Sequence, residues 1–151
     1  MSKAQIRVGK RFQRSINLEA DFRESSAIRD FVVSPLAWET LCRMIQGLAS
    51  ANGNQAWALV GPYGSGKSSF AAFLANAIGT EHRRAAQRKI KDSWGDEAQE
   101  FGRTLKGIGE GLIPVPIVGE RAPLALMIVR GLERAMNEHW NSRGRRPASF
   151  K

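Results

Sequence analysis

The sequence contains a single cysteine, Cys42, which excludes an intramolecular disulfide and a metal cluster built from thiolates. It also lacks a run of about twenty apolar residues, the length that a membrane-spanning helix needs. The first twenty residues are basic and polar, without the apolar core of a signal peptide. We therefore expect a cytoplasmic protein that makes no membrane contact. Its 151 residues are enough for one domain with a substantial core.

Acidic residues are missing from both ends of the chain. Residues 1–14 hold five cations and residues 141–151 hold four, and these nine equal the whole net charge of +9. The body between them is balanced, with fourteen basic and fourteen acidic side chains. Basic ends of this kind can contact nucleic-acid phosphates, and Arg143, Arg145 and Arg146 are the densest group. Plain solvated tails have the same composition, so both interpretations stay open.

Local patterns divide the chain into three parts: a basic arm or strand over 1–30, a nucleotide-binding domain over 31–140, and a basic tail over 141–151. Within the second part, Ser34 is a plausible N-cap and Pro35 suits a first helical position, so a helix is predicted over 35–50. The short apolar run 56–60 is typical of a buried strand. A second helix follows the glycine-rich loop and ends near Gly79.

The rest of the predicted domain continues this alternation of helices and strands. Residues 80–111 are dense in charge, with seven basic and six acidic side chains, and are interpreted as one or two surface helices inserted between core elements. The apolar run 112–118 predicts a second strand, at a sheet edge because Pro114 and Pro116 lack a ladder donor. Pro123 then opens another helix. This order predicts an α/β fold with a parallel sheet.

One motif indicates the kind of ligand that the protein binds. Residues 61–68 match the phosphate-binding pattern G-x-x-x-x-G-K-[ST] at every fixed position. The candidate ligand-binding residues are Gly61, Pro62, Tyr63, Gly64, Ser65, Gly66, Lys67, Ser68 and Ser69.

Each fixed residue of the pattern has a physical role. Glycines let several backbone N–H groups approach one anion, and the helix that starts near Lys67 adds unpaired amides and its positive dipole end. Lys67 places a charge on the β and γ phosphates, and the Ser68 hydroxyl ligates Mg²⁺. Since the loop joins a predicted strand to a predicted helix, we expect it to bind a nucleoside triphosphate, most simply ATP.

The loop resembles the Walker A motif of P-loop NTPases, and the form GPYGSGKS with a linker and helix ahead of it is similar to AAA+ and STAND-type ATPases. The resemblance covers residues 30–79 well and 112–140 loosely. It implies a parallel-sheet P-loop fold, and it makes residues 31–33 candidates for a wall against the adenine. Ordinary core packing explains the same residues equally well.

The resemblance has gaps. No apolar run ends in the acidic pair of a Walker B element, and no sensor strand, arginine finger or guanine-reading motif is visible. The chain is therefore interpreted as an incomplete P-loop fold, the amino-terminal portion of a longer ATPase, with hydrolysis doubtful in this chain alone. Self-association or a larger ATPase assembly would supply what is missing.

Two other functions stay open. One is a small-molecule phosphotransferase in which the terminal arginines form a lid. The other is a basic nucleic-acid-binding module whose nucleotide site is vestigial. A metal site at His82 and His139 is not expected, because they stand 57 positions apart with no cysteine nearby.

Overall fold

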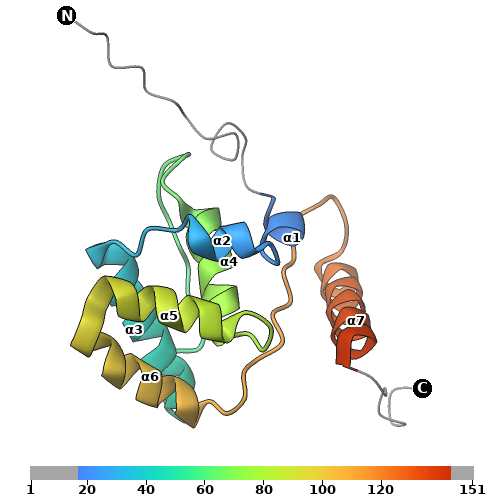
Figure 1. Ribbon diagram of the computed structural model, residues 1–151. Helices are drawn as coiled ribbons and strands as arrows, with labels where there is room; N and C mark the ends of the chain where they lie inside the picture. Colours follow the sequence, from blue (N-terminus) through green and yellow to red (C-terminus); the bar gives the residue numbers. More distant parts are fainter. Residues whose placement is uncertain (1–16, 144–151) are drawn as a thin grey trace, which may run out of the picture.

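The computed structural model describes residues 17–143, and over this range the chain is a set of helices joined by turns and long connections (Figure 1). The helical elements are α1 (Leu18–Asp21), α2 (Ser25–Arg29), α3 (Pro35–Ala49), α4 (Lys67–Ile78), α5 (Arg83–Trp94), the 3₁₀ turn η2 (Gly95–Glu97), α6 (Ala98–Gly107) and α7 (Leu124–Arg143).

The predicted parallel sheet is wrong. Residues 17–143 contain no β-strand, and their one β-bridge pairs Gly79 with Leu112 in parallel. Both predicted strands, 56–60 and 112–118, run as connections without partners. A strand is stable only when a neighbour takes up its backbone groups, and Val60 is instead 94% exposed. The α/β class predicted from the sequence is therefore corrected to a helical fold.

Helix α3 begins and ends close to the prediction. The Ser34 side chain accepts a hydrogen bond from the Ala37 N–H at 3.3 Å, and Pro35 occupies the first turn. This cap satisfies one of the amides that a helix start leaves unpaired. The helix buries one face, which consists of Trp38, Leu41, Met44 and Ile45.

The charged segment 80–111 forms helices as predicted, α5 and α6, but their apolar faces belong to the core and not to a surface insertion. Ile90 of α5 and Leu105 of α6 are fully buried, together with Phe73 of α4. The Trp38 and Trp94 rings stack with centroids 5.3 Å apart and join α3 to α5. Charged side chains cover the outer faces of α5 and α6, whereas their apolar stripes close a four-helix core with α3 and α4.

The predicted amino-terminal arm or strand is also different where it is described. Residues 17–30 form α1 and α2, and residues 1–16 lie outside the described range. Phe22 and Ala27 pack with Ala72 in a small second cluster, so these short helices rest on α4.

Helix α7 begins directly after Pro123, as predicted, and lies to one side of the other helices (Figure 1). Its inner face approaches the connection before it so closely that a Cβ on Gly131 would lie 2.9 Å from Cγ1 of Ile117. Met127 and Ala135, four residues on either side of Gly131, are buried on the same face. No helix within residues 17–143 combines the length and apolar character needed to cross a membrane.

Candidate nucleotide-binding site

The glycine-rich loop occupies the tight connection into α4. Gly64 and Gly66 have φ angles of 81° and 84°, in the left-handed region that favours glycine. The Ser65 N–H donates to the Pro62 carbonyl at 3.3 Å, which closes a turn between them. These conformations bend the chain sharply back toward the start of the helix.

The amino-terminal end of α4 faces the loop. Gly66 is its N-cap and offers no capping side chain, so the first amides of this twelve-residue helix keep no intrahelical acceptor. The Phe70 N–H donates to the Gly66 carbonyl at 2.8 Å, which shows that regular helix starts there. An uncapped helix start with its positive dipole end is a favourable position for an anion.

Lys67 holds its ammonium group across the same loop. Its Nζ atom donates to the carbonyl oxygens of Gly61 at 2.8 Å and Pro62 at 2.7 Å, and it lies 3.3 Å from the Ser65 hydroxyl. The lysine therefore folds back over the loop that precedes it. One positive charge and the free helix amides are brought to one small region.

The predicted binding residues lie at the surface, within reach of a large ligand. Residues 61–66 and Ser68 are exposed, and Lys67 and Ser69 are half-buried. Tyr63, at the tip of the loop, is 92% exposed. Ser68 occupies the second position of α4, where its exposed hydroxyl could take a place among the oxygen ligands of Mg²⁺ beside a phosphate.

The linker ahead of α3 packs mainly into the core. The Phe31 ring stacks on Phe73 with centroids 4.5 Å apart, and Val33 is only 6% exposed. The Trp94 side chain donates to the Val33 carbonyl at 3.0 Å and fixes the linker. Core packing thus accounts for Phe31 and Val33, and of the three proposed adenine-wall residues Val32 is the one that stays exposed, at 77%.

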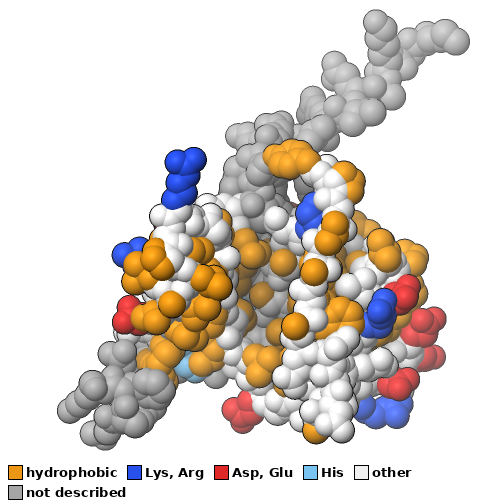
Figure 2. Space-filling view, turned by 180° about the vertical axis from the view of Figure 1, so that it is seen from behind, with side chains coloured by type: hydrophobic (Ala, Val, Ile, Leu, Met, Phe, Trp, Pro, Cys, Tyr) orange, Lys and Arg blue, Asp and Glu red, His pale blue; other side chains and the backbone are white. Residues whose placement is uncertain are grey.

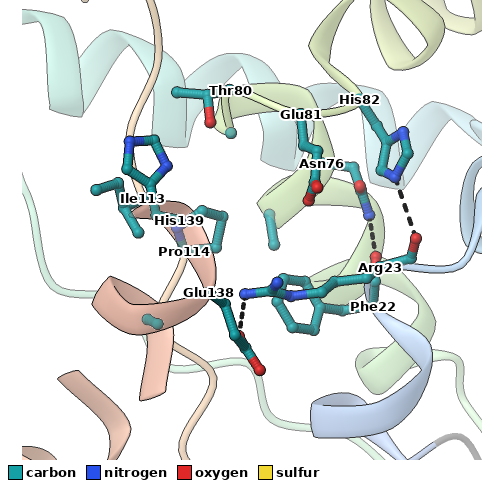
Figure 3. Close-up of a pocket in the computed structure, with 13 residues that line it drawn as sticks. Phe22, Arg23, Asn76, Thr80, Glu81, His82, Ile113, Pro114, Glu138 and His139 are labelled. Carbon is teal, nitrogen blue, oxygen red and sulfur yellow. Dashed lines mark hydrogen bonds and ion pairs between the residues drawn. The ribbon is translucent and has the colours of Figure 1, made fainter. Parts of the chain in front are cut away.

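A small cavity forms where the turn between α1 and α2 meets the end of α4 and one face of α7 (Figure 3). Arg23 forms an ion pair with Glu138, and the His82 ring nitrogen Nε2 lies 3.1 Å from the Arg23 carbonyl oxygen. The cavity holds about 40 Å³, which is room for one or two water molecules and no nucleotide. We interpret this cavity as part of the polar contact between α7 and the rest of the protein.

Both histidines of the chain line this cavity, and their spacing in the sequence did not reveal that they lie close together. His82 follows α4 and His139 lies on α7, and the fold brings them to one cavity. The described residues contain no group of three or more His, Cys, Asp or Glu side chains that could hold a metal ion.

A larger cavity, of about 270 Å³, lies between α3 and α6 beside Cys42. Burial raises the pKa of the Cys42 thiol above its ordinary value, and the carboxylates of Glu100 and Glu97 raise it further. Both effects disfavour the thiolate. Cys42 therefore behaves as a small apolar residue of α3.

The basic ends lie almost wholly outside the described residues. Arg143 closes α7, and Arg145 and Arg146 follow beyond residue 143. Contact between these cations and nucleic acid stays a prediction from the sequence.

Comparison of the chain with protein-family models, with curated proteins and with solved structures found no match.

Proposed function

We propose that this chain is an ATP-binding module that holds Mg²⁺–ATP at the loop of residues 61–68. One observation supports the proposal above the others: the Lys67 ammonium and the uncapped start of α4 converge on a loop whose two left-handed glycines expose its backbone. A positive charge beside several free amides forms an anion site, and triphosphates are the anions that such loops hold.

Each residue has a distinct part in this proposal. The amides at the start of α4 and in the loop donate to the α and β phosphate oxygens. Lys67 exchanges its bonds with the Gly61 and Pro62 carbonyls for bonds with the β and γ phosphates. Ser68 offers its hydroxyl to Mg²⁺, which takes its other ligands from phosphate and water.

Binding without efficient hydrolysis is the activity that we propose for the chain alone. Phosphoryl transfer to water requires a positioned water molecule and a firmly held Mg²⁺, which in P-loop enzymes depend on acidic residues that this sequence lacks. The chain would become an ATPase when another polypeptide supplies these parts. We propose the cytoplasm as its location, since ATP is abundant there.

Titration with a fluorescent ATP analogue in Mg²⁺ tests the proposal. The wild-type chain should bind, and Lys67→Ala should lose binding while circular dichroism shows an unchanged helical fold. Lys106→Ala removes an exposed cation from the last turn of α6 and is the matched control, with unchanged affinity expected. Equal affinity in folded Lys67→Ala and wild type would refute the site.

Competition between unlabelled nucleotides identifies which nucleotide base the site prefers. Because the sequence has no guanine-reading motif, unlabelled ATP should displace the analogue at least as well as GTP. Displacement by GTP alone would contradict the assignment to ATP.

A further inference from the structure

A groove of about 490 Å³ lies between helix α7 and the connection that leads into it. This is the size of a site for one small molecule. The connection contributes Ile117, Val118 and Glu120 to its lining, and α7 contributes Met127, Arg130 and Arg134. The lining therefore combines apolar side chains with two cations and one anion.

The two arginines begin a stripe of hydrogen-bond donors that continues along α7 beyond the groove. An α-helix turns by about 100° and rises about 1.5 Å per residue, so four polar side chains fall within an arc of about 60° and span about 16 Å. They are Arg130, Arg134, Asn137 and Asn141, and all four are exposed. Neither acidic residue of α7, Glu133 or Glu138, falls within this arc.

This stripe has the chemistry of a phosphate-binding surface. The guanidinium group presents its N–H donors in a planar fork that matches two oxygens of one phosphate, and an asparagine amide donates two further hydrogen bonds. Arg130 forms no ion pair within residues 17–143, so its charge is available to a ligand. Because the donors extend past the groove, a ligand that meets all of them is a polymer with repeated negative charges.

We propose that a single strand of nucleic acid binds along this face, with one nucleotide in the groove and the following phosphates on the stripe. Arg130 and Arg134 donate to phosphate oxygens, and Ile117 and Met127 contact the sugar or base. A single strand can turn one base outward into a groove, whereas a duplex keeps its bases stacked inside. The groove has no aromatic lining residue, so binding depends on the backbone and not on the base sequence.

An anionic membrane is another polyanion that arginines can meet, but α7 is not arranged for it. Helices that lie in a membrane surface carry their cations beside an apolar face that enters the lipid. On α7 the centre of the basic arc lies roughly 160° from that of the apolar side chains of Ile128, Val129 and Leu132. Figure 2 shows hydrophobic side chains gathered over this helix. One flat surface cannot contact both faces, which favours a strand in the groove.

Fluorescence anisotropy of a labelled single strand of about twelve nucleotides, at several salt concentrations, measures the binding. Arg130→Gln/Arg134→Gln should weaken it roughly tenfold or more at about 50 mM salt and reduce the salt slope by about 1.4, because each phosphate contact of a single strand contributes about 0.7. Arg84→Gln/Arg88→Gln is the matched control. It removes two exposed arginines at the same spacing on α5 and should leave affinity and slope nearly unchanged.

Other variants test the roles within the face. They are compared in a background with Arg143, Arg145 and Arg146 replaced by Gln, which removes the charge of the basic tail. Glu120→Gln should strengthen binding, because it removes the negative charge from the groove. Asn137→Ala/Asn141→Ala should weaken binding without changing the salt slope, since the amides carry no charge.

Several outcomes would overturn the proposal. One is an absence of binding even at the lowest salt, and another is an equal loss for the two arginine pairs, which would show a response to net charge alone. Equal affinity for a duplex of the same sequence would exclude the groove as the site. Binding to vesicles that contain phosphatidylserine, in place of the single strand, would assign the face to a membrane. Lys67→Ala should bind the strand as tightly as wild type, which separates this test from that of ATP binding.

Discussion

The Nζ atom of Lys67 lies 2.7 Å from the carbonyl oxygen of Pro62 and donates a hydrogen bond to it. Together with the bond to the Gly61 carbonyl, this contact ties the first turn of α4 to the start of the loop. Lys67 thus has two effects, because it orders the loop and supplies its charge. Any substitution of Lys67 changes both, so the loop's conformation needs a test that leaves the lysine in place.

Gly66→Ala provides that test. A side chain at φ 84° costs about 1–2 kcal/mol, so we expect the free energy of unfolding to fall by about 1 kcal/mol and ATP to bind more weakly. Gly102→Ala is the control, because Gly102 lies inside α6 with open space around the new Cβ. There alanine should stabilise the protein by about 0.5–1 kcal/mol. Urea unfolding measures both changes, and a stabilising Gly66→Ala would contradict the left-handed loop.

Ser68→Ala should weaken ATP binding mainly when Mg²⁺ is present. Its hydroxyl serves the metal, whereas the amides of the loop and Lys67 serve the phosphates. The same titration with Mg²⁺ and with excess EDTA measures the difference. Ser93→Ala removes an exposed hydroxyl on α5, outside the loop, where it donates to the Lys89 carbonyl, and should change neither titration. An identical loss for Ser68→Ala in both conditions would place its hydroxyl on phosphate.

Purified chain should release phosphate from ATP far more slowly than an ordinary ATPase, which turns over on the order of once per second or faster. The reason is the missing acidic strand end that would clamp Mg²⁺ and position water. A phosphate-release assay at saturating ATP, with Lys67→Ala as the background, measures the rate. If turnover is ordinary, substitution of Asp92, Glu110 and Glu120 in turn should locate the responsible carboxylate.

Alkylation of Cys42 should remain slow until the pH exceeds the ordinary pKa of a thiol, because burial and two carboxylates raise its pKa. Iodoacetamide labelling across a pH series reports the midpoint. Glu97→Gln/Glu100→Gln should move that midpoint down, and Glu110→Gln, outside the cavity, should not.

The raised pKa of Cys42 also makes the free energy of unfolding depend on pH. The unfolded chain releases the thiol proton first, so the contribution of Cys42 is fully present below its ordinary pKa and is lost as the pH rises through the folded value. A labelling midpoint at or below the ordinary value would contradict the burial of Cys42.

The sequence by itself determined the local features of this protein. Ser34 and Pro35 set the start of α3, and Gly79 ends α4, because caps and helix breakers act over a few residues. The loop of residues 61–68 could be located for the same reason. Its candidate ligand-binding residues are contiguous in the sequence, so no tertiary contact is needed to bring them together.

Tertiary structure decided what depends on distant partners. Apolar runs such as 56–60 suggest strands, but a strand exists only where another strand pairs with it, and neither predicted strand finds one within residues 17–143. Ile90 and Leu105 enter the core because α5 and α6 pack on α3 and α4, although their neighbours are mostly charged. His82 and His139 meet at one cavity for the same reason. Contacts between residues far apart in sequence have no local signal, so only the packed fold could reveal them.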